Sequence, residues 1–547
     1  RMVLQTEVFP NEQSPTGTPL NLAVLNVGYY PKLRGPYNYD TAFINPSDGT
    51  FTNPQNKWGG IMRPIQETDF EANNIGFIEF WMMDPYNGDT NKTNGNLQGA
   101  NSTGTLYFDL GDVSEDVLPD GLKSFENGLP TNTSDVADSA NINNPWTRTN
   151  WGHVPVNPSL VNAFNNDPTT RPFQDIGLDG LSDAQEQGFF SEYLGAMSKA
   201  YGASSGAYLN ALSDPSTDDY HYYRGDDYDA AGTTVLNRYM KYNGLEGNSP
   251  TQAQYAGQNA GGYPTTQSTL PNTEDINQDN TLSTDETYYE YQVKFDPKNI
   301  NPNNTGNNFI TNAFQGPAVS TPAGSRPGVT WYQFKIPISE YIKKVGPIAD
   351  FKSIRFIRMY FKGFDKPVMC RFAKLELVRD DWRKYTGTLL APGDYLPTDD
   401  GLTTFNMYGV NLEENAGRTP VNYVIPPGIQ RQLNLQSANL VQENEGSLAL
   451  QLCNLQDGDA RGVYKNVQLD LRAYKNLQMF VHCESADRAH LLKEGDVTAF
   501  IRIGSDFTQN YYEYEVPLQV TPAGSYSTNS ANDQSAVWPD ANQMNIQ

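Results

Sequence analysis

The pattern with the most specific chemistry is an acidic segment of twelve residues, DINQDNTLSTDE, at positions 275–286. Its oxygen-bearing residues match positions 1, 3, 5, 7, 9 and 12 of an EF-hand-type calcium loop, in which the seventh residue contributes its carbonyl. They are Asp275, Asn277, Asp279, Thr281, Ser283 and Glu286. Asn280 replaces the glycine usual at the sixth position, and asparagine tolerates the left-handed backbone required there. The segment predicts a calcium site; the alternative is a polar loop of Asx turns that binds no ion.

A degenerate version of the pattern, DIGLDGLSDAQE, lies at positions 175–186. Its candidate ligands are Asp175, Asp179, Leu181 through its carbonyl, Asp183 and Glu186, whereas Gly177 removes one ligand. Calcium binding and an ion-free loop both stay open here. A third acidic stretch, STDDYHYYRGDDYD at positions 216–229, reads as a solvated charged loop, because charge runs usually face water. Calcium in the first two loops would have a structural role.

Patterns that support catalysis are scarce. Four histidines and three cysteines leave little material for histidine-based catalysis or a Cys/His zinc site. Glycine-rich phosphate loops, GxSxG elbows and HExxH patterns are missing. A carboxylate pair for glycoside hydrolysis is one alternative, and sugar stacking is another, on Trp58, Trp146, Trp151 and Trp331. Ordinary packing explains the same residues, so we expect a non-catalytic protein.

The composition describes a folded, acidic protein. Of 547 residues, 37% are hydrophobic and 12% aromatic, which is enough for real cores. The net charge of −25 repels phosphate backbones and argues against nucleic acid as a partner. The first residues lack the order of a signal peptide, and no apolar stretch approaches the ~20 residues of a membrane helix. Cys453 and Cys483 fall on two predicted neighbouring strands, where a disulfide or two buried thiols would fit.

Alternation with a two-residue period predicts strands at 289–295 and 332–338. Near-continuous apolar runs at 74–83 and 353–361 predict central strands, and 372–378 predicts a closing strand. Long connections rich in glycine, proline and asparagine separate these segments. Together they predict a mainly β fold of jelly-roll-like antiparallel β-sandwich domains with a mixed, partly helical insertion.

The middle of the chain carries few strand signals, and segments 188–212 and 233–242 have helical spacing. Residues 1–144 and 287–390 are therefore expected to form a first, discontinuous sandwich. Residues 145–286 are expected to form an insertion with helices and the calcium loops.

An internal repeat predicts a second sandwich over residues 400–547. TYYEYQVKF (287–295) resembles NYYEYEVPL (510–518), and TPAGS follows both, at 321–325 and 521–525. Upstream, 76–83 corresponds more loosely with 476–483, and 104–116 with 496–507. The first copy continues past residue 338 with strands that have no counterpart before residue 547, so the second sandwich is expected to be incomplete at its C-terminal end.

Six longer motifs carry a resemblance to a known family. They are RGPYNYD (34–40), residues 53–86, DGLSDAQE (179–186), DDYHYYRGDDYD (218–229), GLEGNSP (244–250) and DINQDNTLSTDETYYEY (275–291). The chain resembles part of the SprA (Sov) family, the large outer-membrane translocons of the type 9 secretion system, which also support gliding motility. The resemblance covers most of the sequence.

The resemblance implies several properties. Full-length family members form a protein-conducting β-barrel in the outer membrane. This chain would then consist of soluble domains carried between barrel segments. The resemblance favours the extracellular over the periplasmic face of the membrane for these domains. Implied partners are the rest of the translocon barrel, a PorV-type shuttle protein, a plug protein and secreted cargo. The expected function is a non-catalytic scaffold or cap of the translocon. The alternative is a cell-surface carbohydrate-binding or glycan-hydrolysing sandwich protein.

Overall fold

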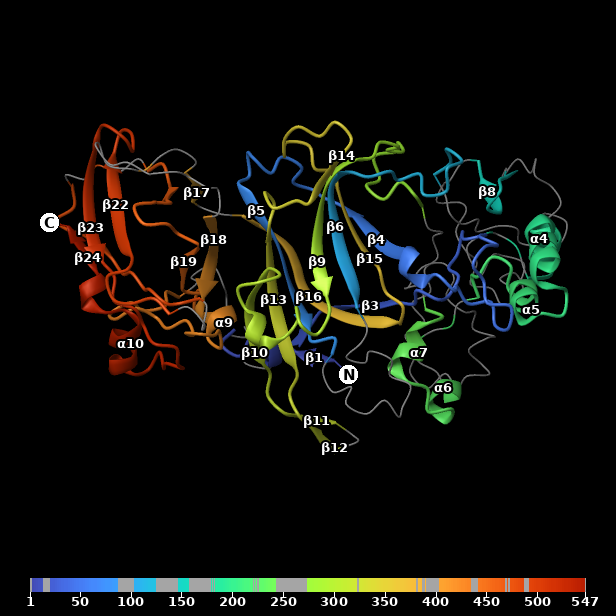
Figure 1. Ribbon diagram of the computed structural model, residues 1–547, viewed down its shortest axis with the longest axis horizontal. Coiled ribbons are helices and arrows are strands. Elements are labelled where there is room, and N and C mark those ends of the chain that lie inside the picture. Colours follow the sequence, from blue (N-terminus) through green and yellow to red (C-terminus); the bar gives the residue numbers. More distant parts are fainter. Residues whose placement is uncertain are drawn as a thin grey trace.

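The computed structural model describes residues 2–12, 20–86, 103–123, 146–156, 179, 181, 183–219, 221, 223, 226–242, 273–321, 324–379, 382–385, 389, 403–433, 441–467, 470, 473–486 and 491–546. The protein is extended along one axis (Figure 1). A group of long strands lies in the middle, helices α4 and α5 lie near one end, and strands β22 to β24 lie near the other. The fold is mainly β with a few helices, as the sequence predicts.

The central body consists of two five-stranded antiparallel sheets. The first has the order β10-β13-β5-β16-β3, with bounds Ile310–Gln315, Thr330–Pro337, Ile75–Met83, Val368–Arg379 and Val24–Tyr29. The second has the order β14-β9-β6-β15-β4, with bounds Lys343–Val345, Thr287–Phe295, Gly104–Asp112, Phe356–Lys362 and Trp58–Pro64. Consecutive strands repeatedly change sheet, which is the jelly-roll kind of connection. Strands from both sides of residues 124–272 therefore share each sheet.

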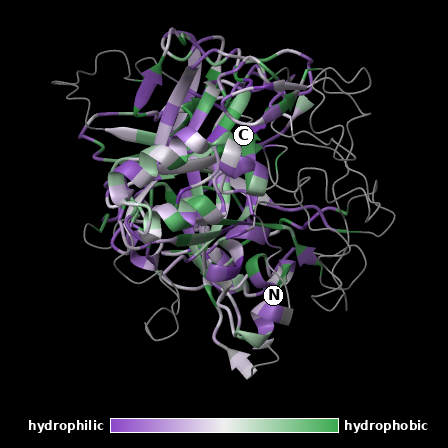
Figure 2. Ribbon diagram, turned by 90° about the vertical axis from the view of Figure 1, so that its right-hand side faces the viewer, coloured by the Kyte–Doolittle hydropathy of each residue, from purple (hydrophilic) through white to green (hydrophobic). Residues whose placement is uncertain are grey.

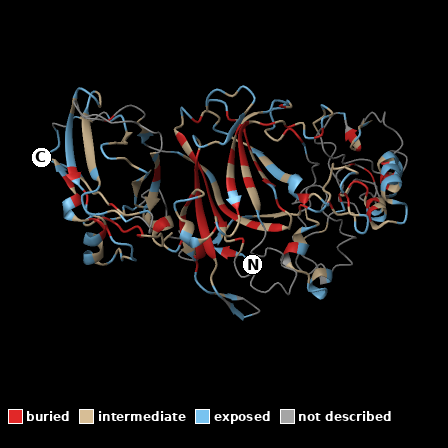
Figure 3. Ribbon diagram, viewed as in Figure 1, coloured by how far each residue is buried: buried red, intermediate tan, exposed pale blue. Residues whose placement is uncertain are grey.

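The two sheets pack face to face through aromatic side chains. Phe80 of β5 is fully buried and stacks on Phe334 of β13, with ring centroids 4.7 Å apart. It also approaches Phe108 of β6, in the other sheet, at 5.4 Å. Burial is concentrated on these central strands (Figure 3), and bands of hydrophobic and hydrophilic residues alternate along several strands (Figure 2). The predicted strands at 74–83, 289–295, 332–338, 353–361 and 372–378 correspond to β5, β9, β13, β15 and β16, and are confirmed.

Several helices lie in the strand-poor region between β6 and β9. They are α3 (Asp183–Phe189), α4 (Ser191–Tyr201), α5 (Gly206–Ser213), α6 (Asp226–Ala230) and α7 (Val235–Tyr239), preceded by the hairpin β7 (Trp146–Arg148) and β8 (His153–Pro155). Leu194 and Met197 of α4 and Ala207 of α5 pack with Ile44 and Phe51, which lie between β3 and β4. Helices α4 and α5 are thus packed on a loop of the sandwich. The expected helical segments 188–212 and 233–242 are confirmed.

Smaller elements complete the N-terminal part. The strands β1 (Val3–Leu4) and β2 (Asn21–Leu22) pair around helix α1 (Gln5–Val8). Phe9, directly after α1, packs edge-on against Trp81 with centroids 5.2 Å apart on the outer face of β5. The hairpin β11 (Val319–Thr321) and β12 (Gly324–Arg326) projects from the sandwich (Figure 1).

From residue 383 onward, the described strands form two-stranded antiparallel sheets. They pair β17 (Arg383–Lys384) with β20 (Val463–Tyr464), β18 (Thr404–Asn411) with β19 (Gly446–Cys453), β21 (Leu477–Met479) with β24 (Met544–Ile546), and β22 (Thr498–Gly504) with β23 (Tyr511–Pro517). Helices α9 (Leu412–Asn415) and α10 (Ala531–Val537) accompany them. The second sandwich expected over residues 400–547, incomplete at its C-terminal end, stays a prediction.

The internal repeat corresponds to the same antiparallel pair in both copies. In the first copy Gly111 of β6 lies opposite Tyr288 of β9, and in the second Gly504 of β22 lies opposite Tyr511 of β23. A Cβ on Gly111 would lie 2.3 Å from the Thr287 carbonyl oxygen, and one on Gly504 would lie 2.1 Å from that of Asn510. Each repeat therefore needs a glycine at this close approach of two backbones.

The two copies differ in burial. Tyr289 and Tyr291 of β9 are at most 1% exposed, whereas the matching residues Tyr512 and Tyr514 of β23 are 86% and 37% exposed. The same sequence pattern thus lies inside a sandwich in one copy and at the surface in the other.

The cysteines differ from the expectation of neighbouring strands. Cys453 ends β19, whose partner is β18, and Cys483 lies outside the named strands. Both are free thiols, with Cys453 exposed and Cys483 buried. Neither the disulfide nor the pair of buried thiols is therefore found. The reason is that residues 476–483 pair through β21 with β24 instead of lying beside β19.

Candidate metal centres

The first predicted calcium loop lies directly before β9 and has the curled backbone of such loops. The carboxylate of Asp275 accepts the N–H groups of Asn280, at 2.8 Å, and of Asp279, at 3.1 Å. Asp279 in turn accepts the N–H of Thr281 at 2.8 Å. The Thr281 hydroxyl, followed by this backbone bond, lowers the pKa of Asp279. Asn280 has a φ of 68°, the left-handed conformation expected at the sixth position. The loop is thus a chain of Asx turns around its first residue.

A carboxylate from outside the loop lies on its inner side. Glu115, which follows β6 and is fully buried, accepts the N–H groups of Ile276 at 3.1 Å and Ser283 at 3.0 Å. Two predicted ligands face arginines instead: Asp279 lies 3.2 Å from Arg355, and Glu286 lies 3.4 Å from Arg358. The carboxylates of Asp275, Asp279 and Glu286 do not form a group of three with oxygens within 4.8 Å of one another. Calcium at 275–286 stays a prediction.

In the second predicted loop, the structure brings together two of the candidate ligands. Carboxylate oxygens of Asp179, Glu186 and Asp218 lie within 4.8 Å of one another, and all three residues are at most 4% exposed. Leu181 is also buried, and its N–H donates to Asp179 at 2.9 Å. Asp183 begins α3, whereas Asp175 lies outside the described residues.

The third member of this group was missed by the sequence analysis, which expected residues 216–229 to be solvated. Asp218 is 4% exposed, so that expectation is wrong for its N-terminal part. The physical reason is a local network: the Ser216 N–H donates to Glu186 at 2.9 Å, and the Ser216 hydroxyl lies 2.8 Å from Glu186 and 2.7 Å from Asp218. Downstream, Asp227 and Asp229 do lie near the surface, paired with His221 and Arg238. Only tertiary packing distinguishes these aspartates.

Burial and neighbouring carboxylates disfavour ionisation of Glu186 in the Asp179–Glu186–Asp218 group. Burial, followed by the neighbouring Asp218 carboxylate, raises the pKa of Glu186 to about 8. Carboxylates this close repel one another, and a low-dielectric site strengthens the repulsion. A hard divalent cation with oxygen ligands fits such a donor set.

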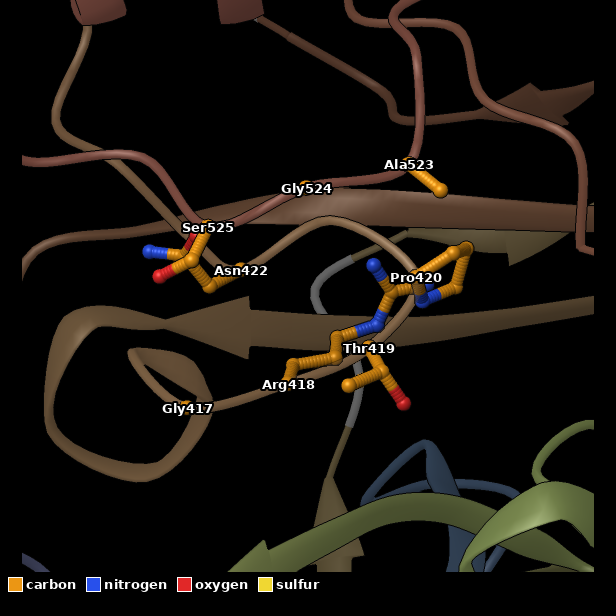
Figure 4. A pocket seen from close by; sticks show the side chains of 8 residues that line it. All are labelled: Gly417, Arg418, Thr419, Pro420, Asn422, Ala523, Gly524 and Ser525. Atoms are coloured by element: carbon orange, nitrogen blue, oxygen red, sulfur yellow. The ribbon is translucent and has the colours of Figure 1, made fainter.

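A cavity in the C-terminal part has different chemistry (Figure 4). It has a volume of about 420 Å³ and is lined by Gly417, Arg418, Thr419, Pro420, Asn422, Ala523, Gly524 and Ser525. The last three belong to the second TPAGS motif. Arg418 donates to the Val421 carbonyl at 2.9 Å and forms an ion pair with Glu484. This guanidinium is held by the protein itself, and the lining contributes no acid–base pair.

The tryptophans proposed for sugar stacking have unequal exposure. Trp331 is 1% exposed and lies in the sandwich, so it is wrong as a sugar platform. Trp146 stacks on His153 with centroids 3.8 Å apart. Trp58 is 59% exposed and meets Tyr360 edge-on at 5.7 Å. An isolated exposed tryptophan is normal on a protein surface.

These features define a class of protein: an acidic, mainly β protein with a central sandwich and a buried carboxylate group in its helical region. Residues 192–547, more than half of the chain, match the family model SprA_N, described as motility related/secretion protein. The chain belongs to this family. A search of curated proteins finds no match. In the part of the chain that the structure describes, no helix combines the length and the apolar character needed to cross a membrane.

Proposed function

We propose that this chain is a non-catalytic scaffold or cap of the outer-membrane translocon of the type 9 secretion system, placed at the mouth of its protein-conducting barrel. Membership of a motility and secretion family supports the general role. The rest of the translocon is its proposed principal partner, with the PorV-type shuttle, the plug protein and cargo as further ones. Such a role requires domains that keep a fixed arrangement relative to one another while cargo passes.

The observation that carries this proposal is a buried polar junction between the sandwich and the C-terminal part. Lys335 of β13 lies 3.0 Å from the Glu79 carboxylate of β5, and both side chains are at most 8% exposed. The same ammonium donates to the Gly409 carbonyl of β18 at 3.0 Å. One buried charge pair thus connects two parts of the molecule.

Further hydrogen bonds extend the junction. Gln333 of β13 donates to Glu79 at 2.6 Å, and Asn415 of α9 donates to Gln333 at 3.2 Å. Lys374 of β16 forms an ion pair with Glu414 of α9 at 3.1 Å. Satisfied polar networks of this kind fix one arrangement, because sliding would leave buried groups unpaired. A rigid junction suits a scaffold that restricts the route of cargo.

Calcium belongs to the same proposal. The Asp179–Glu186–Asp218 group would hold a calcium ion at the start of the helical region, and the 275–286 loop would hold another before β9. The ions would supply positive charge to acidic connections and stiffen them, a structural role without catalysis.

The test uses the full-length translocon in its own bacterium, with cargo secretion and outer-membrane leakage as readouts. Lys335→Met is expected to lower secretion or raise leakage at an unchanged amount of translocon in the membrane. Lys352→Met, which removes an exposed lysine, is the matched control and should change neither. The proposal is wrong if deleting residues 1–547 leaves both secretion and leakage unchanged.

The glycan-binding alternative has its own readout. A glycan array and a turnover assay on this chain should give no signal for a scaffold. Binding that disappears in Trp58→Ala would favour the alternative, because Trp58 is the exposed candidate.

A further inference from the structure

A second carboxylate group lies where the insertion meets the sandwich. Asp116 and Asp120 lie in the segment that follows β6, and Glu274 directly precedes the 275–286 loop. The two segments are joined by a backbone hydrogen bond from the Glu274 N–H to the Lys123 carbonyl at 2.8 Å. The Glu115 N–H donates to the Ser283 carbonyl at 2.7 Å a short distance away. Residues 124–272 connect these two segments, so the group stands at the closing point of that long connection.

The three carboxylates converge. One oxygen from each of Asp116, Asp120 and Glu274 lies within 4.8 Å of the other two. Glu274 is 1% exposed. Its Oε1 accepts the Leu118 N–H at 2.8 Å, whereas its Oε2 is buried and accepts no hydrogen bond. The Oδ2 of Asp120 is also buried without a hydrogen bond, while its Oδ1 accepts the Leu122 N–H at 2.8 Å.

Two buried oxygens without hydrogen bonds thus lie in a group of three acids. Leaving a buried acceptor unsatisfied destabilises the fold, and more so when the group is charged. Carboxylates that satisfy backbone N–H groups with one oxygen and keep the other without a hydrogen bond retain an oxygen that can bind a cation. This separates the group from an ordinary acidic surface patch.

Compensating positive charge is missing from the described surroundings. No ion pair formed by a described lysine, arginine or histidine reaches Asp116, Asp120 or Glu274. The nearby Lys123 directs its ammonium to the Asn280 side chain, at 2.8 Å. Burial, with Asp120 and Asp116 adding to it, raises the pKa of Glu274 to about 8. Burial and the Asp116 charge likewise raise the pKa of Asp120.

We propose that Asp116, Asp120 and Glu274 bind a divalent cation, calcium in preference to magnesium, at a site separate from both loops predicted by the sequence. Calcium accepts irregular sets of carboxylate oxygens, whereas magnesium demands near-octahedral geometry and gives up its water reluctantly. The ion joins the end of the β6 segment to the beginning of the segment that leads into β9. It therefore fixes the two ends of the long connection against each other and against the sandwich.

The test measures calcium binding to the full chain after treatment with a chelator, with calcium chloride as the probe. Isothermal titration and native mass spectrometry give the affinity and the number of ions. Glu274→Gln keeps the shape of the side chain and its acceptor for the Leu118 N–H. It should bind one calcium ion fewer than the wild type, or bind that ion at least about tenfold more weakly. Glu192→Gln is the matched control, because Glu192 is exposed on α4 and belongs to neither carboxylate group, so this variant should bind as many calcium ions as the wild type.

The melting temperature separates a ligand from a merely structural residue. In chelator at pH 8, Glu274→Gln should melt above the wild type, because the substitution removes a buried, repelled charge. Calcium should raise the melting temperature of the wild type more than that of the variant. The difference between the two melting temperatures should therefore shrink or change sign. Calcium binding at pH 7 should also release protons, detected as an enthalpy that depends on the buffer.

If Glu274→Gln fails to fold, Asp120→Asn provides the same comparison at a less buried position. The proposal is overturned if both variants bind as many calcium ions as the wild type with equal affinity. It is also overturned if Glu274→Gln melts below the wild type in chelator and responds to calcium in the same way.

Discussion

Removing Lys335 tests the energetic weight of the buried junction. Its ammonium lies 3.0 Å from Glu79, whose side chain is 8% exposed. Lys335→Met leaves that carboxylate buried without its cation, and breaking a buried pair in this way costs about 3–5 kcal/mol. The lost hydrogen bond to the Gly409 carbonyl adds about 1 kcal/mol. Burial of the apolar methionine side chain offsets part of these two costs. We therefore expect the free energy of unfolding to fall by ~3–5 kcal/mol.

The double variant Glu79→Gln with Lys335→Met should recover most of this loss. Its glutamine carries no charge and still offers a carbonyl to Gln333, which donates to Glu79 at 2.6 Å in the wild type. A large favourable coupling between the two substitutions would show that the lone charge causes the instability.

The pH dependence gives a second check. Burial raises the pKa of Glu79, and the Lys335 ammonium opposes this rise. Without the lysine the carboxyl should hold its proton to a higher pH in the folded state. A group that binds more protons in the folded state loses stability as the pH rises through its titration. The loss of unfolding free energy caused by Lys335→Met should therefore grow from acidic towards neutral pH.

The assay is urea unfolding followed by tryptophan fluorescence, since Trp81 and Trp331 are buried in the two strands that carry the pair. Urea is preferable because a salt denaturant screens charge. Lys352→Met, at an exposed lysine, is the control. The reasoning is refuted if Lys335→Met shifts the midpoint no more than the control, or if the double variant is as unstable as the sum of its single substitutions.

Three further predictions concern the sandwich and the acidic group. Gly111→Ala should lose more than about 1 kcal/mol of stability, because its Cβ would lie 2.3 Å from a backbone oxygen at a φ of +154°. Gly188→Ala, whose Cβ would meet nothing within 4 Å, should be neutral or stabilising, and equal melting temperatures of the two variants would contradict the prediction. Phe80→Ala should cost about 3–5 kcal/mol by urea unfolding, and a loss below 1 kcal/mol would refute its central place in the core. In chelator, stability should fall between pH 4.5 and about 8 as Glu186 loses the proton that the fold retains, and Glu186→Gln should flatten that slope.

Much of the sandwich was predictable because its signals are local. Alternation at 289–295 and 332–338 depends only on one face of a strand meeting the core, and both segments are strands at those positions. The helical spacing at 188–212 is likewise a local property. The pairing partners were not predictable: β5 lies between β13 and β16, which follow it by more than 200 residues.

The acidic residues show what the spacing of residues in a sequence can and cannot predict. At 275–286 the sequence indicated the left-handed Asn280 and offered Asx turns as the alternative to calcium; both features depend on neighbouring residues in the chain. It did not predict that Glu115 would occupy the inner side of the loop, since Glu115 is distant in sequence. The same limit applies to Asp218, whose burial depends on Ser216 and Glu186 meeting in space.

The sequence by itself determined the family, the mainly β class, the positions of the long central strands and the acidic character of the chain. These follow from composition and from periods of two or 3.6 residues, which act over short distances along the backbone. Only the tertiary structure decided which carboxylates converge, which tyrosines of the repeated hairpin are buried, and that Lys335 joins two parts of the molecule. The reason is physical: desolvation and charge repulsion depend on what surrounds a group in space, and the chain order does not contain that information.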